Sequence, residues 1–184
     1  MNSLQVLMDE HRLIERAVDA LVVYAREVGR GADHPRADLA GFVEFIRGYA
    51  DAHHHGKEED ILFRAMADCG MPTNAGPLAV MLAEHHEARR LTAVMAELAD
   101  DVGDWEDQER SRLLKSGIGY AQLLRAHIQK EDGILYPMAQ NMLPEDAREQ
   151  VEQLFQRFEA EAANVERASR LETAVTELAE RYPG

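Results

Sequence analysis

Two stretches of this chain decide its fold: HHHGKEEDILF at residues 53–63 and RAHIQKEDGILYP at residues 125–137. Each stretch contains a histidine followed four residues later by a glutamate: His55 with Glu59, and His127 with Glu131. In a helix, this spacing places imidazole and carboxylate on one face, about 5–6 Å apart at Cβ. The pattern therefore predicts helices that carry metal-ligand side chains on one face.

The rest of the chain also favours helix. Breaks rich in Gly, Pro, Asn and Asp separate segments with helical spacing of apolar residues. We predict helices over residues 3–28, 37–68, 76–101, 107–140, 145–164 and 167–181, and no strand. Short connections predict antiparallel neighbours. The expected fold is all-α: an antiparallel up-down-up-down four-helix bundle over residues 1–142, with one or two extra helices over residues 143–184 that pack on the bundle or on a partner.

The apolar face of each long segment includes a histidine: His11, His55, His85 and His127. Counting residues from the breaks, at a rise of 1.5 Å per residue, puts all four within about one or two turns of the same height. The fourth face also includes Tyr120, Leu124, Ile134 and Met138 beside His127 and Glu131. Residues beside His55 are small, which leaves room for a ligand.

A buried glutamate is costly unless it is paired or bound to a metal ion. Two inward glutamates, each beside a histidine, therefore indicate a cation, and imidazole with carboxylate suits iron, manganese or zinc. If Glu59 and Glu131 each bridge two ions, every ion receives two histidines and two carboxylate oxygens. A solvent oxo or hydroxo bridge would add a fifth ligand. About one position per ion would stay open for dioxygen, peroxide or nitric oxide.

One neighbouring pair competes with this ligand set. His54 and Glu58 have the same spacing, but their face also carries Arg47 and Asp51, so we expect it to be solvated.

Asp132 competes with Glu131. At 100° per residue, Glu131 lies about 40° round the helix from His127, whereas Asp132 lies about 140° away. The angle favours Glu131, although a π-bulge could reverse the choice.

Composition excludes several classes of partner. The chain of 184 residues has a net charge of −14, which argues against nucleic acid and anionic membranes. No apolar run approaches the roughly 18 residues needed to span a bilayer. Cys69 is the single cysteine, and the N-terminal residues lack the pattern of a signal peptide. We expect a soluble cytoplasmic protein; the sequence does not set its oligomeric state.

The order H, HxxxE, H, HxxxE resembles the hemerythrin-like family, also called the HHE cation-binding domain. The resemblance covers roughly residues 5–140 and is carried by Asp9-Glu10-His11, the stretch from His55 to Phe63, the stretch from Gly76 to His85, and the stretch from His127 to Pro137. It implies an antiparallel four-helix bundle that holds two non-heme iron ions, oxo- or hydroxo-bridged, in preference to manganese or zinc. The implied ligands are His11, His55, Glu59, His85, His127 and Glu131.

The chain departs from the oxygen-carrying members of that family. They place a second histidine one turn after the third-helix ligand, where this chain has Arg89, and they bridge with an aspartate at the position of Asp132. The missing histidine either opens a coordination position or lets Arg89 act from outside the ligand set. A salt bridge to a nearby acid is the alternative for Arg89. The resemblance implies a protein that binds dioxygen or a related small molecule for storage, sensing or detoxification. The alternatives are a di-iron enzyme acting on peroxide or nitric oxide, and an iron-centre repair or iron-donor protein.

Overall fold

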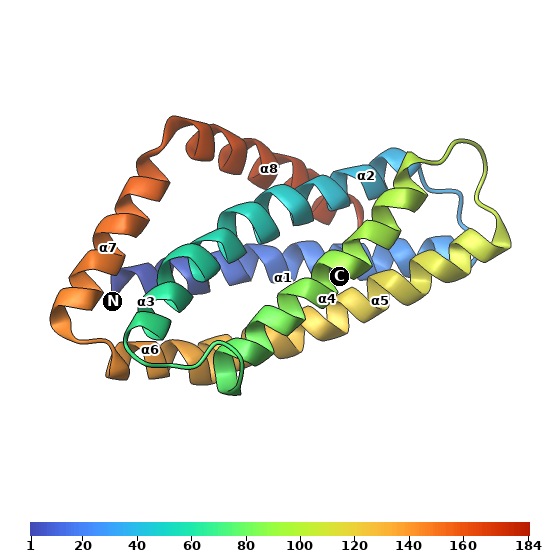
Figure 1. Ribbon diagram of the computed structural model, residues 1–184. Coiled ribbons are helices and arrows are strands. Elements are labelled where there is room, and N and C mark those ends of the chain that lie inside the picture. Colours follow the sequence, from blue (N-terminus) through green and yellow to red (C-terminus); the bar gives the residue numbers. More distant parts are fainter.

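The computed structural model describes residues 1–184, and all its regular elements are helical (Figure 1). The predicted all-α class is confirmed, and the predicted bounds differ from the observed ones by a few residues. The helices are α1 Asn2–Gly29; α2 Arg36–Phe45, continued by η1 Ile46–His55, η2 Glu58–Phe63 and α3 Arg64–Asp68; α4 Gly76–Asp100; α5 Asp107–Lys130, continued by η3 Glu131–Leu135 and α6 Tyr136–Met142; α7 Glu145–Ala160; and α8 Ala162–Arg181.

Glycines end two of the long helical stretches. Gly31 follows α1 with φ of +103°, and Gly70 follows α3 with φ of +99°. In both places the next amide donates to a carbonyl five residues back, from Ala32 to Glu27 and from Met71 to Met66. This is the Schellman arrangement, which favours glycine because the residue adopts a left-handed conformation. Both turns therefore stop the helix where the sequence breaks predict.

Three segments are wound more loosely than an α-helix. In η1, η2 and η3 the backbone is π-helical, so that each turn contains more residues. The wider turns change which residues face inward. Ile134, which the 3.6-residue period places on the inner face, is 54% exposed, whereas Leu135 and Tyr136 are buried. The prediction for Ile134 is wrong because η3 adds a residue to that turn.

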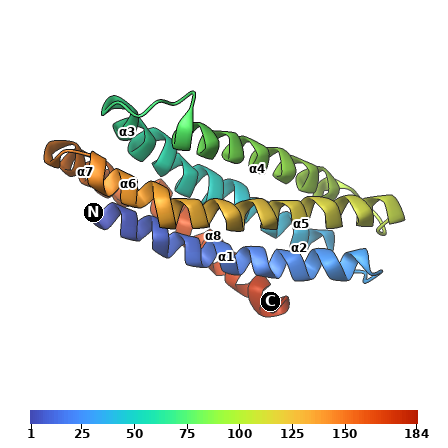
Figure 2. The same cartoon turned by 90° about the horizontal axis from the view of Figure 1, so that it is seen from below.

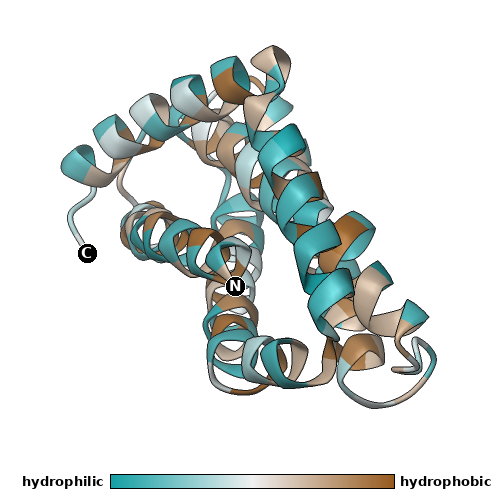
Figure 3. Ribbon diagram, turned by 90° about the vertical axis from the view of Figure 1, so that its left-hand side faces the viewer, coloured by the Kyte–Doolittle hydropathy of each residue, from teal (hydrophilic) through white to brown (hydrophobic).

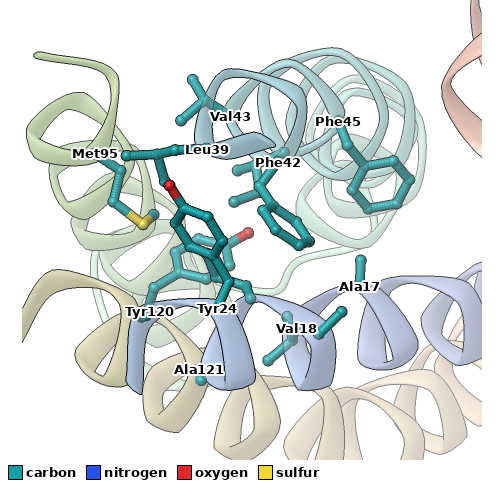
Figure 4. Packing of buried hydrophobic residues seen from close by; sticks show 14 of the residues in the cluster. Ala17, Val18, Tyr24, Leu39, Phe42, Val43, Phe45, Met95, Tyr120 and Ala121 are labelled. Carbon is teal, nitrogen blue, oxygen red and sulfur yellow. The ribbon is translucent and has the colours of Figure 1, made fainter. Parts of the chain in front are cut away.

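The long helices pack side by side (Figures 1 and 2). Their buried apolar side chains form two separate cores. In the larger core, Tyr24, Phe42 and Tyr120 converge from three different helices (Figure 4). The smaller core lies near the start of α1. It contains Leu7 of α1 and Leu62 of η2, together with apolar residues of α3, α4, α6 and α7. Between the cores lies a layer of histidine and acidic side chains.

The two C-terminal helices belong to the same packing. Val151 and Phe155 of α7 lie in the smaller core, and Leu171 and Val175 of α8 lie in the larger one. Helix α8 contacts α1, α2 and η1, while α7 contacts α1 and η2. Hydrophilic residues cover much of the outer sides of the helices in Figure 3. No helix combines the length and the apolar character needed to cross a membrane.

Candidate metal centre

The histidines predicted to share one level meet in a buried cluster between the two cores. Nε2 of His85 lies 3.0 Å from Nε2 of His127. The ring of His55 stacks on that of His85, with centroids 3.8 Å apart. His11 lies across the cluster, and all four side chains are nearly inaccessible to solvent. Four separate helical stretches each contribute one of these rings.

Glu131 lies between the histidines of different helices. Its Oε2 is 3.3 Å from Nε2 of His11, and its Oε1 is 3.0 Å from Nε2 of His127. The carboxylate is fully buried. Asp132 lies outside the cluster, where it contacts Nδ1 of His11 at 2.7 Å and pairs with Arg12. Of the two candidate acids, Glu131 and Asp132, the one that lies inside the cluster is Glu131.

On the second helical stretch the structure differs from the prediction. Glu58 enters the cluster: it is fully buried, and its Oε2 lies 3.5 Å from Nε2 of His85. Glu59 lies outside, where its Oε1 contacts Nδ1 of His85 at 2.7 Å and accepts a hydrogen bond from Arg89 at 2.8 Å. The cause is the π-helical winding of η1 and η2, which rotates Glu58 inward.

His54 joins the cluster for the same reason. The expectation that His54 and Glu58 face solvent is wrong, since their exposed fractions are 1% and 0%. The ring of His54 lies 4.6 Å from that of His11, and its Nε2 is 3.7 Å from Oε2 of Glu58. His55 stays inside as well. Three consecutive histidines followed by two consecutive glutamates are a sequence signal that an ordinary helical period leaves unexplained.

Each of the five histidines has a carboxylate at its outer nitrogen, Nδ1. An ionised carboxylate only accepts hydrogen bonds, so Nδ1 carries a proton and Nε2 is the atom that faces the cluster. Such carboxylates fix the tautomer and orientation of metal-bound histidines. The contacts are His11 with Asp132 at 2.7 Å, His54 with Glu10 at 2.8 Å, His55 with Asp51 at 3.3 Å, His85 with Glu59 at 2.7 Å, and His127 with Glu84 at 2.9 Å.

Arg89 joins two of these outer carboxylates. Its Nε donates to Asp51 at 2.8 Å, and its Nη2 donates to Glu59 at 2.8 Å. Burial alone would raise the pKa of Glu59. The hydrogen bonds from His85 and Arg89 outweigh burial and lower that pKa. Arg89 therefore contacts Asp51 and Glu59, the carboxylates that hold His55 and His85, and it lies outside the cluster.

Opposite charges shift the pKa values inside the cluster. Burial alone lowers the pKa of His11, but the hydrogen bond with Asp132 and the nearby carboxylate of Glu131 outweigh it and raise the pKa to about 9. Burial also lowers the pKa of His127, but the negative charge of Glu131 outweighs it and raises that pKa to about 10. Burial and the charge of His85 lower the pKa of His55 to about 4. Burial would raise the pKa of Glu58, yet the surrounding histidines hold it well below its usual value.

The donor set fits metal ions. Oε2 of Glu58 and both carboxylate oxygens of Glu131 are buried and make no hydrogen bond. Buried carboxylate oxygens without partners are costly, and a cation between them would remove that cost. Ligand atoms lie within 4.8 Å of one another in two groups: His55, Glu58, His85 and His127; and His11, His54 and Glu131. Nitrogen and oxygen donors without sulfur suit iron, manganese or zinc.

A cavity of about 170 Å³ lies beside the cluster. Its wall includes His55 from the cluster and Tyr120, together with Asp51 and Arg89 toward the surface. This volume exceeds that of a single water, whose share of the liquid is about 30 Å³. The cavity is large enough for a diatomic or triatomic molecule.

Two curated proteins are similar to this chain. The iron-sulfur cluster repair protein YtfE of Pectobacterium atrosepticum is 36% identical over 138 residues, and the protein of the same name from Musicola paradisiaca is 32% identical over 136 residues. Each alignment covers 71% of this chain and 60% of the relative, so the chain spans about 60% of the length of these relatives. No solved structure matches the chain.

The family model described as the hemerythrin HHE cation binding domain matches residues 2–139, which include every histidine and glutamate of the cluster. The match covers most of the chain and confirms the resemblance drawn from its histidine spacing. This chain belongs to the hemerythrin HHE cation-binding domain family.

Proposed function

We propose that this protein is a non-heme di-iron protein whose centre binds dioxygen or a related small molecule, peroxide or nitric oxide. The observation that carries the proposal is the set of unpartnered carboxylate oxygens of Glu58 and Glu131. They are enclosed by the inward Nε2 atoms of five histidines. Iron is preferred to manganese or zinc because the family is cation-binding and two relatives are named for iron–sulfur cluster repair.

The contacts support a specific division of ligands. His11 and His54 would hold one ion, and His85 and His127 the other, each through Nε2. Glu131 would bridge, because its two oxygens point to His11 and to His127. Glu58 would bridge in place of the predicted Glu59, with Oε2 between His54 and His85. His55 is the fifth imidazole and lies on the side of the second ion.

When bound, a pair of oxo- or hydroxo-bridged irons supplies the redox chemistry, and the protein supplies its surroundings. The apolar cores on either side of the cluster exclude bulk water. The hydroxyl of Tyr136 donates to Oε1 of Glu58 at 2.8 Å, which orients that carboxylate and leaves Oε2 free. The cavity beside His55 gives a small molecule a place next to the cluster.

The arrangement of the chain is part of the proposal. We infer that the helices of residues 1–142 form an up-down-up-down four-helix bundle, and that residues 143–184 are an extension of it. The packing of α1 on α5, α5 on α4 and α4 on α2 supports that order. The cytoplasm is the predicted compartment, and its reducing conditions suit the exposed free thiol of Cys69.

A second function, iron-centre repair or iron donation, is favoured by the two relatives named iron-sulfur cluster repair protein. A repair protein would restore activity to an iron–sulfur dehydratase that peroxide has inactivated, and would lose iron while doing so. A binding protein would keep its iron in the same assay. Turnover of peroxide or nitric oxide above that of free iron would identify an enzyme instead.

The central test is a metal count with spectra. Protein produced with added iron and purified without oxygen should contain about two irons per chain. Exposure to oxygen should then produce the near-ultraviolet absorption of an oxo-bridged ferric pair. A colourless, iron-free protein from the same preparation would contradict the proposal.

A further inference from the structure

Next to the metal cluster, a lysine is completely buried. Lys57 has no exposed surface, although lysine is almost never fully buried unless it is paired. Its ammonium contacts three partners: Glu10, Glu159 and Nε2 of His53, the last at 3.2 Å. All three ammonium donors are therefore used. This is a built polar network, and none of its members belongs to the proposed ligand set.

Glu10 connects this network to the cluster. Its Oε1 contacts Lys57 and lies 3.2 Å from Nε2 of His53, while its Oε2 accepts from Nδ1 of His54 at 2.8 Å. The position of the Glu10 carboxylate is thus set from both sides. Whatever holds Lys57 in place also holds the carboxylate that orients the ring of His54.

The third partner comes from a different part of the chain. Glu159 lies on α7, beyond the residues 2–139 that match the family. The same helix covers Lys57 with two aromatic rings, those of Phe155 and Phe158, whose centroids are 5.9 and 5.7 Å from Nζ. Helix α7 therefore encloses the ammonium and supplies one of its two carboxylate partners.

Glu10, His53 and Glu159 are close enough together to hold a metal ion. The ammonium of Lys57 already contacts each of them, so that it occupies the place a cation would take. We therefore assign no third metal to this group. Its cation is built into the chain.

We propose that Glu159 is a positioning residue that acts through Lys57 and Glu10 to orient His54, so that the docking of α7 sets the affinity for one of the two metal ions. The inference rests on the proposed di-iron function. Without the Glu159 carboxylate, Lys57 has Glu10 as its single anionic partner. The carboxylate of Glu10 is then drawn toward the ammonium and away from Nδ1 of His54, and the ring loses its fixed orientation.

The test compares matched variants of the metal-free full chain, titrated with Co²⁺ without oxygen. Glu159→Gln removes the proposed link, and Glu10→Gln removes its middle member. Glu152→Gln is the control, because Glu152 also joins α7 to α1, by accepting from the amide and hydroxyl of Ser3 at 3.2 and 3.0 Å, but touches no member of the network. Removing an outer partner of a metal ligand weakens metal binding about 10- to 100-fold.

We expect Glu10→Gln to weaken one of the two Co²⁺ steps by about 10- to 100-fold and Glu159→Gln to weaken the same step by about tenfold. Glu152→Gln should leave both steps and the visible spectrum unchanged. Equal weakening by Glu152→Gln and Glu159→Gln would show a general effect of helix docking and would overturn the inference. So would wild-type binding by Glu159→Gln.

A second measurement needs no metal. The ¹⁵N shifts of the His54 imidazole report which nitrogen carries the proton. They should show an Nδ1–H ring in the wild type and in Glu152→Gln, and a mixture of tautomers in Glu159→Gln. Unchanged shifts in Glu159→Gln would overturn the inference. Failure of the wild type to bind two ions would overturn the proposed function instead, so that the two failures are distinguishable.

Discussion

At the scale of single residues, the adjacent acids Glu58 and Glu59 take the same two positions as the adjacent acids Glu131 and Asp132. Glu58 and Glu131 enter the cluster, while the residue that follows each of them, Glu59 or Asp132, contacts Nδ1 of a histidine on another helix. A bridging candidate and an orienting residue are thus neighbours in the sequence. Helical angles alone identify Glu131 correctly as the inward acid but select Glu59 where the structure has Glu58.

Glu58→Gln and Glu59→Gln test this division directly. Glu58→Gln should abolish binding of at least one metal ion, because it removes a negatively charged oxygen from the interior of the cluster. Glu59→Gln should retain two ions with an affinity lowered by about 10- to 100-fold. Metal analysis after gel filtration, followed by Co²⁺ titration, measures both effects. The reverse ranking would place Glu59 in the ligand set.

Tyr136 and Tyr120 make a matched pair for a second prediction. Both are buried, but the hydroxyl of Tyr136 donates to Glu58, whereas Tyr120 lines the cavity and its hydroxyl makes no hydrogen bond within the chain. A hydrogen bond to a charged group contributes about 1.5–3 kcal/mol. Tyr136→Phe should therefore lower the free energy of unfolding of the metal-free protein by about that amount, and Tyr120→Phe should change it little. Urea denaturation measures both, and similar losses would contradict the prediction.

At the scale of elements, the sequence predicts where helices begin and end better than it predicts how they are wound. Glycine turns and apolar spacing locate the long helices to within a few residues. Apolar spacing does not reveal the π-helical segments, because 3.6 residues per turn are assumed before any residue is assigned to a face. The errors at His54, Glu58 and Ile134 all lie in or beside such segments.

Gly133 allows the winding of η3 to be tested. It is exposed, and a Cβ added there would meet no atom within 4 Å. Gly133→Ala should stabilise the protein by about 0.4–1 kcal/mol, since glycine loses more freedom on folding. Deleting Gly133 should tighten the turn, move Tyr136 away from Glu58 and weaken metal binding. Thermal unfolding and Co²⁺ titration measure the two effects; a deletion variant with wild-type affinity would contradict the role of η3.

At the scale of the whole molecule, a charged layer lies between two apolar cores, and the C-terminal helices contribute to both cores. The sequence predicts the shared height of four histidines, because that follows from counting residues along rigid helices. It does not predict that α7 closes over Lys57, since this contact joins residues about one hundred positions apart.

Metal removal should affect the stability of the whole chain. A ligand that binds the folded form alone, at a hundred times its Kd, adds about 2.7 kcal/mol to the free energy of unfolding. For a chain of this size, that corresponds to roughly 5–10 °C in Tm. Calorimetry should show the metal-loaded protein melting higher by about this amount than the chelator-treated protein. Identical melting curves, with the metal content verified, would contradict a site inside the folded core.

The ring of outer carboxylates around the five histidines has a consequence for exchange kinetics. The imidazoles are preorganised: their Nε2 atoms converge before any cation arrives, because the acids behind them fix each ring during folding. Uptake and release then require no gathering or dispersal of the protein scaffold. Such a framework suits a chain that must be emptied and refilled repeatedly without passing through a loosened state.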